Sequence, residues 1–408
     1  MKKIIILLLL TTFLIPINVF SLNYPQLHYK SCIIYDLTDQ KILYELNSNE
    51  SLSIASLTKL LTIITAIENN SDLNKSIIYT QEMQNNVMWY ASSVGFKVGE
   101  ELSFMDLLYG AMLPSGADAT VALAFTTSGS IENFVNKMNI TAQKIGMNNS
   151  NFVNVHGLDE KNHYSTAEDI RKLLDYSLKN ELFKKIYTTR EYTLSTGKKI
   201  MSTIKKTSEK NQIDITKILG SKTGTTGDAG LCISVLINHQ NHELIIITLG
   251  ASQEEKIPYN ILDAIELTKF IENNYSEQTL STQDTTVKTL KIVNSKITNY
   301  EIKSKRNISK FLENDYNIDN FKIQYNGLEE LSYKNEKGEK IGTIKYLYNN
   351  LEIDSEDIYL DINIKPDILK IIYSKKEIII VIISFFIILI TSIMILIKKQ
   401  RNKNVQSI

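Results

Sequence analysis

The chain has 408 residues, enough for two domains, and its 45 lysines and arginines balance its 45 aspartates and glutamates. This balance leaves no basic excess, so we expect no nucleic-acid partner. The five histidines show no metal-ligand spacing, and we expect no metal and no cofactor. Cys32 and Cys232 lie in apolar, strand-like runs, which favours two buried free thiols over one disulfide.

Residues 1–21 have the layout of a secretory signal peptide. Two lysines precede an apolar run, and small or apolar residues lead to Ser21, an acceptable cleavage position. An uncleaved N-terminal anchor is the alternative, although the apolar run is short for a membrane span. The next residues predict two strands, 29–36 and 41–46, joined by a turn.

The segment 54–62 predicts the first turns of a helix, because leucine and isoleucine recur at helical spacing from position 57 to 67. Ser56 and Lys59 are three residues apart, so their side chains lie on the same face of that helix. A serine needs a neighbouring base to become a nucleophile, and a lysine with a lowered pKa can take its proton. The alternative is a helix-capping serine followed by a solvated lysine.

A mainly helical region extends from about residue 60 to 215, and strands return after it. Helical spacing of apolar residues is found at 104–111, 117–127, 131–145 and 166–178, and again at 261–270. Strand patterns occur at 217–225, 231–238 and 243–249, and the turns between them make these strands antiparallel. The order predicts an α+β fold, in which helices cover an antiparallel sheet that is interrupted by a helical insert.

The first of these later strands, which leads into a glycine-rich turn, holds a second lysine. Lys222 would bring a cation close to Lys59 and lower the pKa of its amine. Thr223 and Thr225 offer hydroxyls to a substrate carboxylate beside this cation. Gly224 would let the substrate backbone approach the strand closely. The alternative is an edge strand that carries an exposed lysine.

A second serine, Ser115, lies in a short loop that enters a helix. It can relay a proton to the amine that leaves during the reaction. The backbone N–H groups of Ser56 and Thr225 could together form an oxyanion hole. The alternative for Ser115 is a helix cap with no chemical role.

The last third of the chain changes pattern. The polar residues 276–287 look like a linker, and a period of two from 288 to 365 predicts a small all-β domain. Residues 378–397 are uncharged and, at ~1.5 Å per residue, reach across the ~30 Å of a bilayer core. The basic tail 398–408 predicts a cytoplasmic C-terminus. We therefore expect a single-pass cell-membrane protein whose bulk lies on the extracytoplasmic side.

Three motifs in this order, S-x-x-K at Ser56, S-x-N-like at Ser115 and K-T-G at Lys222, resemble those of the penicillin-recognising serine enzymes. More closely, the chain resembles the D-alanyl-D-alanine carboxypeptidases among the low-molecular-mass penicillin-binding proteins. Further similar stretches are found at 35–38, 43–45, 152–158, 163–167 and 229–232, and in the β domain at 337–342.

The resemblance implies a penicillin-binding, transpeptidase-like fold over residues 24–275. It implies that Ser56 attacks the penultimate D-Ala of a peptidoglycan stem peptide, that the terminal D-Ala leaves, and that water hydrolyses the acyl-enzyme. β-Lactams would act as inhibitors by acylating the same serine. The implied catalytic residues are Ser56, Lys59 and Ser115, and the implied substrate-binding residues are Lys222, Thr223, Gly224 and Thr225.

Ala117 departs from the family pattern, which has asparagine at this position. The resemblance implies that an amide contact with Lys59 and the substrate is lost, whereas Asp118 is expected to face elsewhere. One alternative is therefore a catalytically impaired penicillin-binding protein or cell-wall scaffold of the same fold. A β-lactamase is another, although no Glu-x-x-Leu-Asn deacylation motif is visible and the second domain and anchor argue against it.

Overall fold

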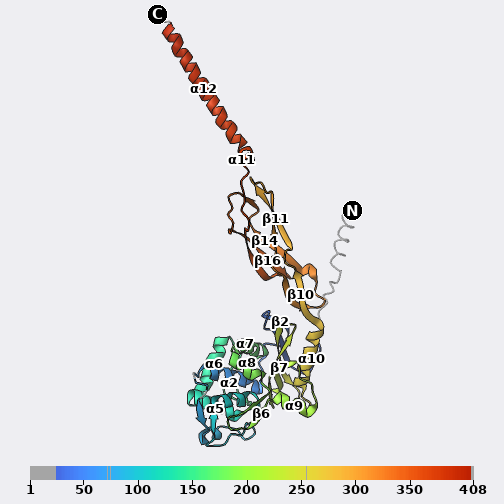
Figure 1. The fold of residues 1–408 in the computed structure, drawn as a ribbon. Coiled ribbons are helices and arrows are strands. Elements are labelled where there is room, and N and C mark those ends of the chain that lie inside the picture. Colours follow the sequence, from blue (N-terminus) through green and yellow to red (C-terminus); the bar gives the residue numbers. More distant parts are fainter. Residues whose placement is uncertain (1–23, 71, 74, 254, 406–408) are drawn as a thin grey trace, which may run out of the picture. The chain divides into compact units, whose positions relative to one another are not determined.

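The computed structural model describes residues 24–405 apart from 71, 74 and 254 (Figure 1). The predicted signal peptide, residues 1–21, lies outside this range. The chain divides into two units, the first ending at Ser276 and the second beginning at Glu277, and each is described by itself.

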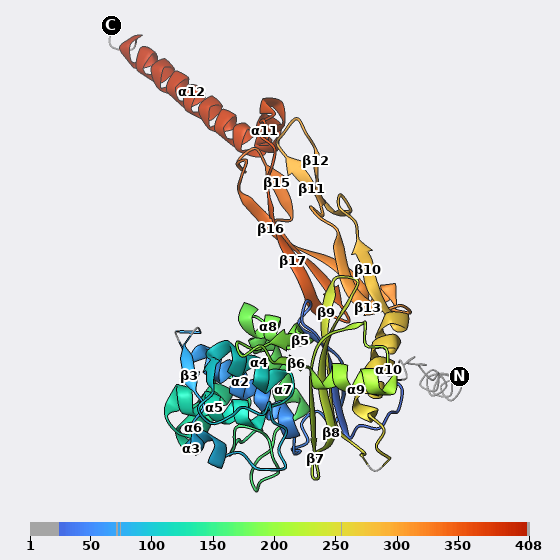
Figure 2. The same cartoon turned by 60° about the horizontal axis from the view of Figure 1, so that its bottom comes forward.

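A five-stranded antiparallel sheet forms the centre of the first unit, with strand order β2-β1-β9-β8-β7. Its strands are β1 Ser31–Asp36, β2 Lys41–Leu46, β7 Ile218–Thr226, β8 Gly230–His239 and β9 His242–Ala251. Every residue of β1 is buried, and almost every residue of β9, so both faces of the sheet are covered. Figure 2 shows the sheet between α10 (Tyr259–Asn274) and the helical region.

The helical region lies between β2 and β7 in the sequence. Its helices are α2 Thr58–Glu68, α3 Gln81–Asn85, α4 Phe104–Met112, α5 Ala117–Ser128, α6 Ile131–Ile145, α7 Ala167–Ser177, α8 Glu181–Thr188 and α9 Thr203–Asn211. Two small two-stranded antiparallel sheets lie among them, β3 Ser76–Ile78 with β4 Glu101–Ser103 and β5 Glu191–Thr193 with β6 Lys199–Met201. Since α2 is buried from Thr58 to Ile67, it is the central helix of the region. The predicted α+β architecture is confirmed.

The two cysteines are free and buried, as the sequence favoured. Cys32 lies on β1 and Cys232 on β8, and β9 runs between these two strands. Neighbouring strands lie ~4.8 Å apart, so residues two strands apart are beyond the reach of a disulfide without backbone movement. The sheet order thus keeps the two thiols apart.

The second unit is built from strands. They are β10 Tyr275–Ser281, β11 Thr286–Val293, β12 Asn299–Lys303, β13 Ile308–Glu313, β14 Phe321–Gly327, β15 Glu330–Ser332, β16 Lys340–Tyr348 and β17 Leu351–Tyr359. β10 pairs with β13, and two three-stranded sheets have the orders β12-β11-β15 and β14-β16-β17. Leu290, Ile302, Ile344 and Ile358 belong to the apolar core that these strands enclose. This is the small β domain that the period of two predicted.

The predicted linker is wrong in its local structure. Of residues 276–287, those up to Ser281 form β10, and β11 begins at Thr286. Exposed and half-buried polar residues alternate from Ser276 to Thr279, and Leu280 is buried. Polar composition indicated a linker because β10 belongs to a two-stranded sheet with a solvated face, where apolar residues are few.

Two helices end the chain, α11 Ile368–Ser374 and α12 Lys376–Val405. The part of α12 from Lys376 to Lys399 is long and apolar enough to cross a membrane, by length and composition. It contains the predicted span, 378–397. This helix is compatible with a membrane anchor.

Candidate active site

Ser56 lies where the central helix meets the sheet. It belongs to η2, a 3-10 turn from Ala55 to Leu57 that leads directly into α2. Strand β7 packs on this turn at Gly224, where an added Cβ would lie 3.0 Å from the backbone nitrogen of Ser56. Gly224 therefore permits the close approach of β7 to η2. The role predicted for this glycine from the sequence was a different one, the close approach of a substrate backbone.

The amine of Lys59 is held between a side chain and a backbone group. Its Nζ donates to Ser56 Oγ at 2.8 Å and to the carbonyl oxygen of His156 at 2.6 Å. Only 2% of Lys59 is exposed, and this burial lowers the pKa of the amine to about 7, although nearby Asp118 raises it. Near neutral pH a substantial fraction of Lys59 is therefore uncharged and able to accept a proton from Ser56.

Lys222 reaches the second serine. Its Nζ donates to Ser115 Oγ at 2.9 Å and to the carbonyl oxygen of Thr223 at 2.8 Å. Burial holds the pKa of Lys222 well below its usual value, and the charge of Lys59 lowers it further. The sequence predicted that Lys222 would lower the pKa of Lys59. In the structure, burial is the main cause of the lowered pKa of Lys59, and the repulsion between the two amines lowers the pKa of Lys222 instead.

The two threonines of the K-T-G strand differ in their surroundings. The hydroxyl of Thr223 is half-buried and lies 2.5 Å from the hydroxyl of Thr203, the first residue of α9. Thr225 is exposed to solvent. The structure therefore leaves Thr225 open, whereas Thr223 must share its hydroxyl with Thr203 or turn away from it to meet a carboxylate.

Backbone strain is concentrated at the two serines. Ala55, just before Ser56, has a φ of 48°, and Ser115 has a φ of 62°. Both are left-handed values that non-glycine residues seldom adopt, and each costs about 1–3 kcal/mol. The carbonyl oxygen of Ala55 accepts a hydrogen bond from Thr58 at 2.9 Å, which helps to hold the strained turn. Such strain persists where the surrounding structure requires one side-chain position, as in a catalytic site.

The buried carboxylate of Asp118 bonds to residues 93–95 and not to the amines of Lys59 and Lys222, so it faces elsewhere, as expected. It accepts from Ser93 Oγ at 2.6 Å and from the backbone nitrogens of Val94 and Gly95 at 2.9 and 2.7 Å. The preceding residue, Ala117, donates its N–H to the carbonyl oxygen of Ser92 at 2.7 Å. These bonds fasten the segment 92–96 to the start of α5, beside Ser115.

His156 was missed as a contributor to the site. Its role is carried by its backbone carbonyl, which binds Lys59 and has no side-chain signature in a sequence. The stretch 152–158 that contains it was singled out by resemblance alone. Burial lowers the pKa of the His156 imidazole to about 3, so this ring adds no positive charge beside Lys59 at neutral pH. Thr203, the partner of Thr223, gave no signal in the sequence.

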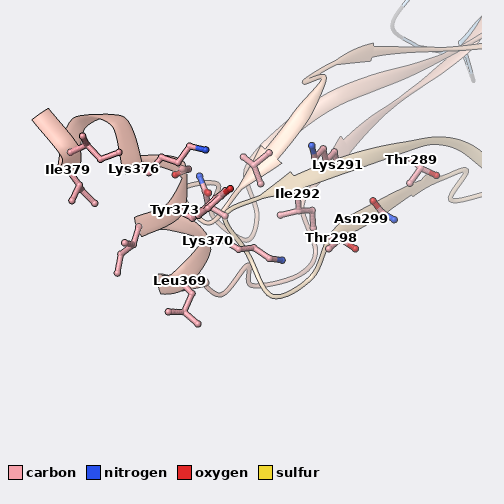
Figure 3. Close-up of a pocket in the computed structure, with 15 residues that line it drawn as sticks. Thr289, Lys291, Ile292, Thr298, Asn299, Leu369, Lys370, Tyr373, Lys376 and Ile379 are labelled. Atoms are coloured by element: carbon pink, nitrogen blue, oxygen red, sulfur yellow. The ribbon is translucent and has the colours of Figure 1, made fainter.

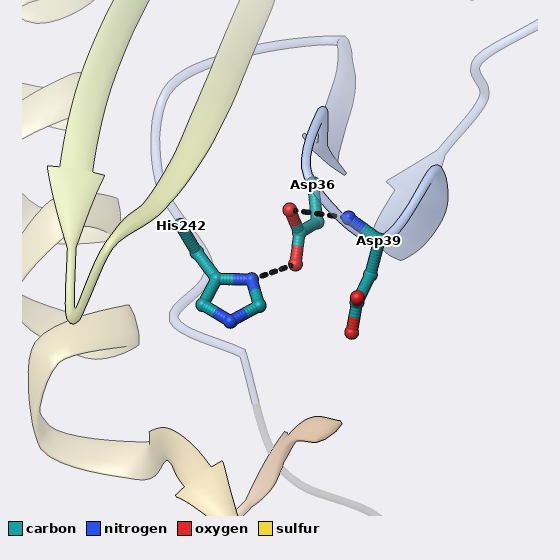
Figure 4. A group of neighbouring side chains, drawn as sticks. All are labelled: Asp36, Asp39 and His242. Carbon is teal, nitrogen blue, oxygen red and sulfur yellow. Dashed lines mark hydrogen bonds and ion pairs between the residues drawn. The ribbon is translucent and has the colours of Figure 1, made fainter. Parts of the chain in front are cut away.

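Asp36, Asp39 and His242 have their ligand atoms within 4.8 Å of one another, the separation that a metal site requires (Figure 4). The carboxylate of Asp36 is already occupied by hydrogen bonds, from His242 Nδ1 at 2.8 Å and from the backbone nitrogens of Thr38 and Asp39 at 2.8 and 3.1 Å. This arrangement braces the β1–β2 turn against β9. Asp36, Asp39 and His242 therefore form a hydrogen-bonded cluster that stabilises the fold.

Comparison with known proteins supports the same family as the motifs. The family described as D-alanyl-D-alanine carboxypeptidase matches residues 18–253. The D-alanyl-D-alanine carboxypeptidase DacF of Bacillus subtilis is 30% identical over 323 residues, which cover 77% of this chain and 80% of that protein. DacC of Escherichia coli, with the same description, is 32% identical over 248 residues, 58% of this chain and 60% of the relative.

Solved structures share the fold. Penicillin binding protein 5 from Haemophilus influenzae superposes with a TM-score of 0.62 at 22% identity, over 84% of this chain and 99% of that one. A peptidoglycan synthesis regulatory factor (PBP3) from Streptococcus pneumoniae gives a TM-score of 0.63 at 20% identity, over 84% and 100% of the two chains. With the family match over more than half of its length, the chain belongs to the D-alanyl-D-alanine carboxypeptidase family.

Proposed function

We propose that the protein is a serine D-Ala-D-Ala carboxypeptidase that removes the terminal D-Ala from peptidoglycan stem peptides. The observation that carries this proposal is the 2.8 Å contact between Lys59 Nζ and Ser56 Oγ, together with the lowered pKa of Lys59. A neutral amine at this position is the base that the serine needs. The relatives' names supply the substrate.

Acylation begins when neutral Lys59 takes the hydroxyl proton of Ser56. The Ser56 oxygen then attacks the carbonyl carbon of the penultimate D-Ala, and the negative charge that develops on the carbonyl oxygen is stabilised by the N–H groups of Ser56 and Thr225. Gly224 brings β7 against Ser56 N, so these two donors belong to segments in contact. An ester between Ser56 and the stem peptide results once the peptide bond breaks.

The leaving amine needs a proton, and Ser115 is placed to give it. The Ser115 hydroxyl donates to the amine, and the Lys222 ammonium, 2.9 Å from that oxygen, replaces the proton. The substrate carboxylate lies near Lys222, Thr223 and Thr225, where it offsets the cost of a buried positive charge on Lys222. Water then attacks the ester carbonyl and gives up a proton, which restores the Lys222 ammonium. The Lys59 ammonium returns its proton to the Ser56 oxygen as the ester bond breaks, and the shortened peptide leaves. β-Lactams acylate Ser56 by the same first step.

The test combines two measurements on the purified extracytoplasmic portion of the chain. A fluorescent penicillin should label the protein stably on a denaturing gel, and a pentapeptide ending in D-Ala-D-Ala should lose its terminal D-Ala. Rapid loss of label with hydrolysis of the drug would instead identify a β-lactamase. Neither labelling nor D-Ala release would identify a scaffold that has kept the fold.

The missing amide at Ala117 is expected to have only a modest effect on the rate of D-Ala release. An ordinary neutral hydrogen bond contributes ~0.5–1.5 kcal/mol, about tenfold in rate, whereas a donor in the oxyanion hole matters ~100–1,000-fold. The side chain of residue 117 is outside the proposed oxyanion hole, whose donors are backbone N–H groups. We therefore expect Ala117→Asn to change D-Ala release by no more than about tenfold.

The Ala117→Asn measurement has a necessary control, because Ala117 is fully buried and a larger side chain strains its surroundings. Thermal unfolding of Ala117→Asn and of Ala117→Ser separates a lost fold from a changed rate. A natural protein with no detectable release, restored fully by Ala117→Asn, would contradict the expectation. It would favour the catalytically impaired alternative.

We propose further that α12 spans the cell membrane and leaves the catalytic unit on the extracytoplasmic side. Lys398 and Lys399 end the apolar part of α12, and more basic residues follow them, which favours a cytoplasmic C-terminus. The substrate, which lies outside the membrane, requires the same orientation. Truncation after Lys370 is expected to give a soluble protein that still reacts with penicillin.

Protease accessibility in intact cells checks the orientation of the full chain. An external protease should degrade the catalytic unit and leave a tag at the C-terminus intact. A protected catalytic unit with an accessible C-terminal tag would show the opposite orientation. The truncated protein serves as the control for protease cleavage of the folded unit.

A further inference from the structure

A cavity of about 1110 Å³ lies in the second unit, between the strands β11 and β12 and the helices α11 and α12 (Figure 3). Its strand side includes Lys291 and Ile292, and its helix side includes Leu369, Lys370 and Lys376. It belongs neither to the catalytic site nor to the same unit. The cavity combines charged and apolar walls, and this combination indicates the kind of molecule that it accepts.

Hydrogen bonds fix the helix side of the cavity to the strand side. The backbone N–H of Asp367 donates to the carbonyl oxygen of Asn294 at 2.9 Å, and Lys370 Nζ donates to the carbonyl oxygen of Ser295 at 2.9 Å. The hydroxyl of Ser295 in turn donates to the carbonyl oxygen of Lys365 at 3.0 Å. The walls are therefore tied together by the residues that lead into α11.

The charge of the cavity is positive. Three of its lining residues are lysines, and none of the described residues that line it is acidic. Lys291 takes part in no ion pair within the described chain, and Lys376 lies over the ring of Tyr373 at 4.7 Å. Glu330 is the register partner of Lys291 on β15, but it does not line the cavity. Two amines thus remain available for an anion.

The remaining walls are apolar and lie at the beginning of the proposed membrane span. Leu369, Ile379 and Ile380 line the cavity, and Leu369 is 79% exposed. Because α12 enters its uncharged stretch at residue 378, the cavity lies at the level where the hydrocarbon gives way to headgroups. Tyr373, 70% exposed, has the position typical of an interfacial aromatic residue.

We propose that this cavity binds an anionic phospholipid of the extracytoplasmic leaflet. The phosphate would lie between Lys291 and Lys376, and an acyl chain would lie along Leu369 and Ile379 toward the bilayer. Such a lipid can pair its phosphate with the lysines and pack its acyl chain on the apolar residues, whereas a free phosphate can contact only the lysines. The inference rests on the proposed membrane span of α12 and is independent of the reaction at Ser56.

The experiment uses the full chain in nanodiscs of phosphatidylcholine that contain a minor fraction of phosphatidylglycerol. Native mass spectrometry after release from the nanodisc should find phosphatidylglycerol retained in preference to phosphatidylcholine. A lysine near an anionic lipid contributes about fivefold to binding, so Lys376→Gln alone should weaken retention about fivefold, and Lys291→Gln with Lys376→Gln about 25-fold. Leu369→Ser, at an exposed position, should weaken it as well. Glycerol phosphate should not displace the lipid.

Lys375→Gln is the matched control, because Lys375 is the exposed neighbour of Lys376 and does not line the cavity. General attraction between a basic segment and anionic lipid would make the Lys375 and Lys376 variants equally weak. That result, equal retention of the two lipids, or displacement by glycerol phosphate would overturn the proposal. A chain that does not insert would overturn it together with the span, while D-Ala release reports separately on the catalytic unit.

Discussion

The Ser56→Ala variant should form no covalent adduct with penicillin and should release D-Ala at least about 10⁴-fold more slowly than the wild-type protein. The reason is that no other described hydroxyl receives a hydrogen bond from the Lys59 amine, which is the proposed base. Mass spectrometry of the penicillin-treated protein gives the site of the adduct, and a D-Ala assay gives the rate.

The control for this variant is Ser51→Ala, which changes an exposed serine in the same segment without reaching Lys59. Its labelling and D-Ala release should equal those of the wild-type protein. An adduct that persists in Ser56→Ala, on any residue and at the wild-type rate, would show that the nucleophile has been assigned incorrectly. Circular dichroism and thermal unfolding establish that both variants fold.

The rate of penicillin acylation should rise with pH through a midpoint near 7 and then reach a plateau. Only the neutral amine of Lys59 can take the proton of Ser56, and its pKa lies at about 7, so the neutral fraction increases as the pH rises. One pH unit below the midpoint the rate should be about a tenth of the plateau. Stopped-flow acylation between pH 5 and 9 measures this profile.

Lys59→Arg tests the same assignment, because a guanidinium stays charged throughout this range. Acylation should fall by about 100-fold or more at every pH, and its rise near pH 7 should disappear. A wild-type profile that is flat between pH 5 and 9 would remove Lys59 as the base. Since only the neutral amine of Lys59 is reactive, the acylation rate must rise with pH. An acylation rate that falls with rising pH would contradict the mechanism directly.

Stability provides a second measure of the same amine. In the unfolded chain Lys59 keeps its usual pKa of 10.5, so between pH 7 and that value the unfolded state binds more protons than the folded state. The contribution of Lys59 to the free energy of unfolding must therefore increase as the pH rises through this window. Lys222, whose pKa is lowered in the same direction, adds to the slope. Lys59→Met should reduce the slope of the free energy of unfolding against pH between about pH 7 and 10, as measured by denaturant unfolding.

Features that depend on residues close together in the chain could be predicted from the sequence. The contact between Ser56 and Lys59 follows from one turn of helix, and the three antiparallel strands after residue 217 follow from short turns. The motif order placed Ser115 and Lys222 in one site, but their direct hydrogen bond joins residues far apart in sequence, and no local pattern predicts it.

Other features were beyond the sequence for physical reasons. The carbonyl of His156 binds Lys59, yet every residue has such a carbonyl. The left-handed conformations of Ala55 and Ser115 are imposed by their surroundings against the preference of both residue types. The strand β10 was taken for a linker because solvent-facing residues of a small sheet are as polar as those of a flexible segment.

The order of strands in the catalytic unit also has a consequence for how the unit comes into being. β1 lies between β2 and β9, and Ser31 pairs with Leu249, about 200 residues away in the sequence. A chain that emerges N-terminus first must keep its opening hairpin unpaired on one edge until β9 follows. Long-range pairing of this kind slows folding and leaves strand edges exposed to aggregation meanwhile. Ser56 and Lys222 therefore meet late, and a nascent or truncated chain that ends before β9 has no complete sheet on which to assemble them.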